Sequence, residues 1–105
     1  MAEIRTALKS GSSKELAKYF PDKVELNLEG KKSHYNRAQA EGLVKDFFAT
    51  NPATDFTYIH QGASKEGLKY AIGKFICTGK SYRVYMLLKN QDGRYTINTL
   101  DFSRE

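Results

Sequence analysis

The chain has 105 residues, of which 40% are hydrophobic and 12% aromatic, so it is long enough to bury one core and we expect a single domain over residues 1–105. Its one cysteine, Cys77, excludes an internal disulfide and a zinc site built from cysteines. The longest uncharged apolar run, 84–88, is far too short to cross a membrane, and no signal peptide is visible.

The first third of the chain predicts two short helices. The apolar residues within 4–8 share one helical face, and Gly11 suits the position just after a helix end. Ser12 followed by Glu15 predicts the start of a second helix, which Pro21 ends.

A strand and the longest helix follow. Residues 24–28 alternate as a strand does, and 29–32 predict a turn. Asn36 with Gln39 three residues later predicts a capping box, and 51–52 end the helix. The apolar positions of this helix repeat at helical spacing and are Ala40, Leu43, Val44, Phe47 and Phe48.

The rest of the chain predicts four strands, over residues 55–62, 68–78, 81–90 and 94–102. A two-residue turn within 78–81 places Phe75 opposite Val84 and Gly73 opposite Met86, and a loop at 63–66 places Phe56 over Gly73. With a further loop at 90–93, the face without charged groups on the two middle strands packs under the helices. This inner face also receives Tyr58, His60, Tyr82, Ile97, Thr99 and Asp101.

The element order resembles that of the nuclear transport factor 2-like superfamily, which includes ketosteroid isomerase and the SnoaL-like cyclases. Several sequence segments resemble an uncharacterised bacterial family within this superfamily, among them Ala7-Leu-Lys-Ser-Gly11, His60-Gln-Gly62 and Tyr82-Arg-Val-Tyr85. The resemblance implies an α+β, cystatin-like cone, with helices on a curved, mostly antiparallel sheet in the order α-α-β-α-β-β-β-β. It also implies export to the periplasm or the medium, and an inner cavity.

Two surfaces are predicted to be binding sites, one for a small ligand and one for a second copy of the chain. Residues expected to line an apolar cavity for a small ligand are Phe47, Tyr58, His60, Phe75, Tyr82, Met86 and Asp101. The outer face of the sheet is expected to form a homodimer, with a plain solvated sheet as the alternative. Its predicted interface residues are Tyr70, Ile72, Ile76, Tyr85, Leu87, Leu100 and Phe102.

The sequence favours the interpretation that the chain is a non-enzymatic binding domain. The apolar side of strand 24–28 offers no carboxylate base where the enzymes that it resembles carry one. The alternative is a lyase or isomerase that uses Asp101 or His60, which the predicted registers keep too far apart to form a dyad. Asp101 is expected beside Tyr82 as a hydroxyl–carboxylate pair. No metal site and no cofactor are predicted.

The positive charge is concentrated in one stretch. The net charge is +5, and residues 65–94 carry seven basic and two acidic side chains, so they hold the whole excess. Polyanion binding through this stretch is a second alternative, although no nucleic-acid motif accompanies it.

Overall fold

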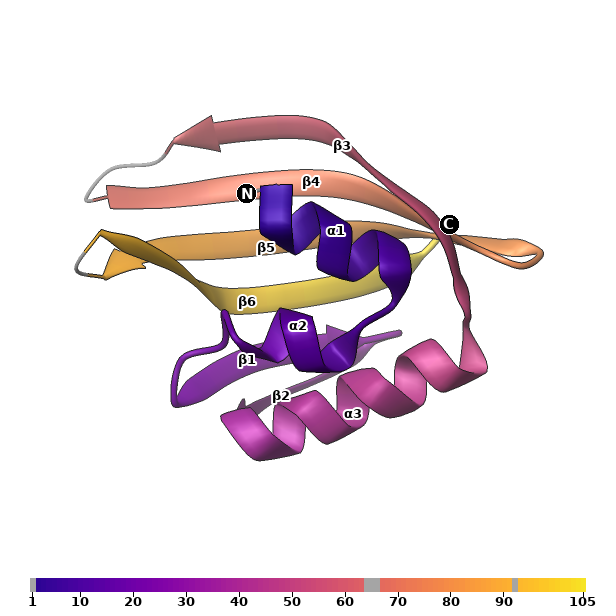
Figure 1. Ribbon diagram of the computed structural model, residues 1–105, viewed down its shortest axis with the longest axis horizontal. Helices are drawn as coiled ribbons and strands as arrows, with labels where there is room; N and C mark the ends of the chain where they lie inside the picture. The colour runs from indigo at the N-terminus through magenta and orange to yellow at the C-terminus, as the bar shows by residue number, and fades with distance from the viewer. Residues whose placement is uncertain (1, 64–66, 92) are drawn as a thin grey trace.

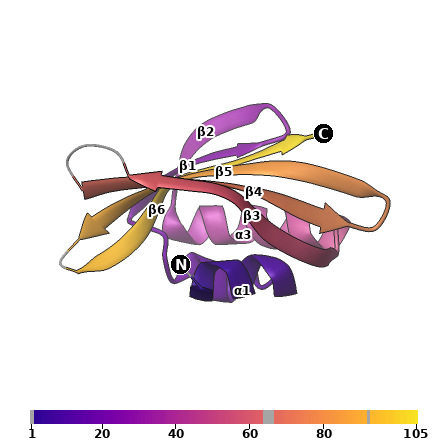
Figure 2. The same cartoon turned by 90° about the horizontal axis from the view of Figure 1, so that it is seen from above.

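Six strands form one curved sheet, and three helices lie together on one side of it (Figures 1 and 2). The computed structural model describes residues 2–63, 67–91 and 93–105, and these counts refer to that part of the chain. The strand order is β2-β1-β6-β5-β4-β3, and neighbours are antiparallel except for the parallel pair β1 and β6. The elements in chain order are α1 (Ala2–Ser10), α2 (Ser13–Ala17), β1 (Lys23–Leu28), β2 (Lys31–Asn36), α3 (Arg37–Thr50), β3 (Ala53–Ala63), β4 (Leu68–Cys77), β5 (Lys80–Gln91) and β6 (Arg94–Arg104).

The predicted α+β fold is confirmed, but the predicted order lacks one strand, β2. This strand pairs with β1 through a two-residue turn, Glu29-Gly30, in which both residues have positive φ (54° and 90°). Positive φ at both central positions is typical of the type I′ turns that close hairpins. Strand β2 was not predicted because its side chains, apart from the partly buried Tyr35, are exposed and show no apolar alternation.

The predicted end of α1 and the predicted starts of α2 and α3 are confirmed, but α2 ends at Ala17 and not at Pro21. Gly11 has φ +68° after α1, and the Ser12 N–H donates to the carbonyl of Ala7 (2.9 Å), which is the pattern of a glycine-terminated helix. At the start of α3, the Asn36 side chain accepts from the Gln39 N–H (2.8 Å), and the Gln39 side chain accepts from the Asn36 N–H (3.2 Å).

An aromatic cluster joins α3 to the sheet. The ring centroid of Phe47 lies 4.7 Å from that of Phe102 and 5.1 Å from that of Tyr82, and Phe48 and Phe75 complete the cluster. The Tyr82 ring is fully buried, and its hydroxyl donates to the carboxylate of Glu29. The helix-facing side of the sheet is therefore the core, as predicted.

The predicted hairpin registers are wrong by two residues, which leaves the faces unchanged because side chains alternate with period two. Phe75 lies opposite Tyr82, and Gly73 lies opposite Val84. Phe56 pairs with Phe75 instead of Gly73. Its ring still covers Gly73, since a Cβ there would lie 2.4 Å from the Phe56 Cζ.

Two β-bulges reverse the predicted faces farther along β3 and β6. Ile59 is the extra residue between Tyr58 and His60, so His60 is exposed on the outer face of the sheet instead of the inner face. Asn98 is the extra residue in β6, where Ile97 pairs with Leu88 and Thr99 with Leu87. Beyond it the predictions are wrong for four residues: Thr99 and Asp101 lie on the outer face, and Leu100 and Phe102 are fully buried in the core.

Replacing Gly73 by alanine is expected to destabilise the fold by about 1–3 kcal/mol, because the new methyl group overlaps the Phe56 ring and the carbonyl of Thr57. Gly42→Ala is the matched control. A Cβ at Gly42, in α3, meets nothing within 4 Å, so alanine should stabilise the helix by up to about 1 kcal/mol. Urea unfolding of both variants measures the difference; equal free energies of unfolding for Gly73→Ala and the native chain would contradict this packing.

The fold is expected to lose stability between pH 10 and pH 12. Burial raises the pKa of Tyr82 to about 12, with a further contribution from its bond to Glu29, and burial also raises the pKa of Tyr58 to about 12. The unfolded chain releases these protons near pH 10, so the stabilisation is complete below pH 10 and is lost as the pH approaches 12. Two pKa units at Tyr82 correspond to about 3 kcal/mol.

Urea unfolding at pH 8 and pH 11.5, together with absorbance titration of the seven tyrosines, checks this expectation. Tyr82→Phe should remove one of the late-titrating groups. Titration of all seven near pH 10 without loss of stability would contradict it.

Candidate functional site

The residues predicted to line an inner cavity divide into two groups. Phe47, Phe75, Tyr82 and Met86 are buried in the core, and Tyr58 is partly buried against it. His60 and Asp101 lie on the opposite face of the sheet. The four buried side chains are therefore packing residues in this structure, and the binding of a small ligand by this set stays a prediction.

Tyr82 has a carboxylate partner, but it is Glu29 and not Asp101. The Glu29 N–H donates to the carbonyl of Phe102 (3.0 Å), which holds the β1–β2 turn against the end of β6. The buried Asn51 lies beside the pair and accepts from Lys80 (3.3 Å) and from the Tyr82 hydroxyl (3.4 Å). With a pKa of about 12, the Tyr82 phenol keeps its proton near neutral pH and donates a hydrogen bond there instead of acting as a base.

No sequence pattern indicated that Glu29 is the partner of Tyr82. Glu29 was assigned only to a turn, and the residues favoured at the first central position of a type I′ turn are Asn, Asp and Gly and not Glu. Glu29 is a non-glycine residue with positive φ, a backbone conformation that is unfavourable unless the surrounding structure stabilises it. We infer that the tertiary contacts of Glu29 hold it in this conformation.

The outer face of the sheet carries a group of large side chains that we call the outer-face patch: Tyr70, Ile72, Ile76, Tyr85 and Leu87. Their placement on this face is as predicted. Tyr85 is 37% exposed, and the other four are partly buried by their neighbours. Leu100 and Phe102, which were predicted to join them, lie in the core instead.

Charged side chains of both signs lie among and beside the patch residues. Lys74, Arg83 and Lys89 are exposed on β4 and β5. On the β6 side, Asp101 lies next to Tyr85, and Glu25 of β1 pairs with Thr99 of β6.

The groups beside the patch are linked by polar contacts. Glu25 accepts from the Thr99 hydroxyl (3.3 Å) and lies 3.4 Å from the ammonium of Lys32. At the other edge, Nε2 of His60 lies 3.0 Å from the hydroxyl of Tyr70. His60 therefore contacts a member of the patch.

The basic stretch 65–94 does not form one surface. Lys69 lies over the ring of Tyr95 on the helix side, with its ammonium 4.7 Å from the ring centroid. Lys74, Arg83 and Lys89 lie among or beside the residues of the outer-face patch, and Arg94 lies in a separate cleft. Lys65 lies outside the described residues.

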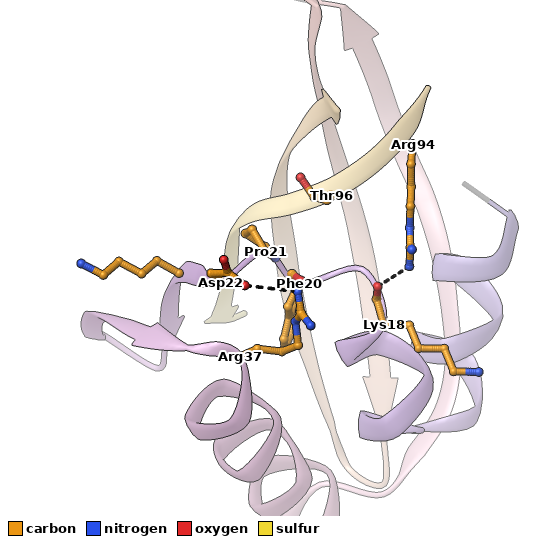
Figure 3. A pocket seen from close by; sticks show the side chains of 8 residues that line it. Lys18, Phe20, Pro21, Asp22, Arg37, Arg94 and Thr96 are labelled. Carbon is orange, nitrogen blue, oxygen red and sulfur yellow. Dashed lines mark hydrogen bonds and ion pairs between the residues drawn. The ribbon is translucent and has the colours of Figure 1, made fainter. Parts of the chain in front are cut away.

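That cleft is a hollow of about 840 Å³ where the segment between α2 and β1 meets the starts of α3 and β6 (Figure 3). Its lining residues are Lys18, Phe20, Pro21, Asp22, Lys23, Arg37, Arg94 and Thr96. The sequence analysis did not single it out, because its two arginines are 57 positions apart in the chain and neither belongs to a motif.

Within 2–63, 67–91 and 93–105, no three His, Cys, Asp or Glu side chains gather as a metal site would require. None of the helices in this part of the chain has the length and apolar character needed to cross a membrane.

The chain is similar to three crystal structures of proteins of one family. The protein from Bacteroides ovatus is 31% identical with a TM-score of 0.93, and the match covers 100% of this chain and 94% of that one. The protein from Bacteroides uniformis is 28% identical with a TM-score of 0.92, covering 99% and 95%. The one from Bacteroides fragilis is 26% identical with a TM-score of 0.93, covering 100% and 98%.

More distant structures show the same fold. An NTF-2 like protein of unknown function from Silicibacter pomeroyi is 13% identical with a TM-score of 0.69, over 99% of this chain and 88% of that one. A domain of unknown function with a cystatin-like fold from Nostoc punctiforme is 14% identical with a TM-score of 0.75, over 99% and 72%. No curated protein matches the chain.

The sequence profile of a family described as "Domain of unknown function (DUF4783)" matches residues 1–103. This match and the nuclear transport factor 2-like fold agree with the resemblance found in the sequence. The chain belongs to the DUF4783 family.

Proposed function

We propose that this domain is a non-enzymatic binding module that pairs with a second copy of itself through the outer face of its sheet. The observation that carries the proposal is the outer-face patch, which places five large apolar or aromatic side chains on a face that no helix of the described chain covers (Figure 2). An apolar centre with a charged rim is typical of a protein interface.

The core supports a binding role over a catalytic one. Apart from the Tyr82 hydroxyl and the Cys77 thiol, Asn51 carries the only buried polar or charged side chain of the described residues, and its amide donates to the carbonyl of Phe47 (3.1 Å). The imidazole and carboxylate that a lyase or isomerase was predicted to use, His60 and Asp101, belong to the outer face.

The charges around the patch fit a second copy of the chain. A two-fold axis parallel to the strands lays the β6 side of one copy over the β4 side of the other. This arrangement brings Asp101 and Glu25 of one copy toward the half of the partner that carries Lys74 and His60. Such pairing uses the same surface twice, as two-fold dimers do, and opposite charges facing each other favour one arrangement over others.

Sedimentation equilibrium is expected to give a dimer of about 24 kDa, twice the 11.9 kDa of one chain. Tyr85→Glu should shift the mass to that of the monomer, because it places a charge at the centre of the buried interface.

Ile59→Glu is the matched control. Ile59 is 63% exposed at the β3 bulge, outside the patch, so the same change there should leave the dimer intact. A native chain that stays at 11.9 kDa at high concentration would overturn the proposal.

A further inference from the structure

The cleft in Figure 3 has a wall that the protein itself holds in place. Three consecutive carbonyls of the segment after α2 accept hydrogen bonds from other elements. Arg94 of β6 donates through Nη2 to the Lys18 carbonyl, the Ile97 N–H donates to that of Tyr19 (2.7 Å), and Nε of Arg37 donates to that of Phe20 (3.0 Å). The cleft is therefore shaped before any ligand arrives, which lowers the ordering cost of binding.

Basic groups outnumber acidic ones in the cleft by four to one. The ammonium of Lys18 is paired with Glu15 outside it (2.9 Å). The single acid, Asp22, lies 3.5 Å from Arg37, but its side chain is fully exposed, and such a pair contributes little. The positive charge of the cleft is therefore only weakly neutralised by the chain.

The two arginines reach the wall from different elements. Arg37 extends from the start of α3 and Arg94 from β6, and both guanidiniums lie at the segment between Lys18 and Phe20 (Figure 3). Each guanidinium has five N–H donors in a planar fork, more than these backbone contacts use. The fork matches the geometry of carboxylate and phosphate groups.

We propose that this cleft binds a small anion that carries two or more phosphate or carboxylate groups. Two guanidiniums from two elements fit two anionic groups of one ligand, and about 840 Å³ lies within the range of small-molecule sites. The partly exposed Pro21 provides an apolar surface for the part of the ligand between its charges. The proposal concerns residues outside the outer-face patch and does not rest on self-pairing.

Calorimetric titration with pyrophosphate and with citrate tests the proposal and distinguishes the two anionic groups. One of the probes is expected to bind with one site per chain, more weakly at 200 mM than at 50 mM NaCl because salt screens the attraction. Arg94→Gln and Arg37→Gln should each lower the affinity at least about tenfold, since each removes charged hydrogen bonds to the ligand.

Lys45→Gln, on the exposed surface of α3, is the matched control, because it removes the same charge outside the cleft. Arg94→Lys should bind with intermediate affinity, since a lysine keeps the charge but lacks the fork. Urea unfolding confirms that each variant is folded. Binding of neither probe, or equal losses for Lys45→Gln and the arginine variants, would overturn the proposal, and neither result bears on the dimer.

Discussion

The packing of Phe47 against the sheet is the contact on which the rest of the structure depends. Its ring lies within 4.7–6.1 Å, centroid to centroid, of four other aromatic rings, and these come from α3, β4, β5 and β6. Aromatic side chains bury large areas and prefer tilted or edge-on contacts such as these. Because they fill the space between helix and sheet, the surfaces left for recognition are the outer face of the sheet and the clefts between its loops.

Most of the fold could be predicted from local signals. Capping residues identified the end of α1 and the starts of α2 and α3, and the uncharged alternation of β4 and β5 identified the face toward the helices. The error of two residues in the hairpin register left that assignment unchanged, because side chains alternate between the faces with period two. A single inserted residue, Ile59 in β3 or Asn98 in β6, exchanged the faces of every residue beyond it. Neither position carries a glycine or another residue that would indicate a bulge in the sequence.

The two bulges also decide which of the candidate site residues were placed on the correct face. The outer-face placement of the five patch residues on β4 and β5 was predicted correctly because no bulge interrupts that pair, whereas Leu100, Phe102, His60 and Asp101 lie beyond the two bulges. Glu29 and the cleft arginines are brought to their partners by contacts between distant parts of the chain: 53 residues separate Glu29 from Tyr82, and 76 separate Arg94 from Lys18. Periodicity and motif spacing report only on neighbours in sequence, so neither could have found these contacts.

Unfolding free energies of Phe47→Ala and Phe47→Leu test most directly whether the space between helix and sheet is filled. A packed cluster predicts a loss of about 3–5 kcal/mol for alanine, because the deletion leaves a cavity among the remaining rings, and a smaller loss for leucine, which refills part of it. If both variants keep the stability of the native chain, Phe47 borders an open chamber, and the account of a closed interior with recognition on the outside is wrong.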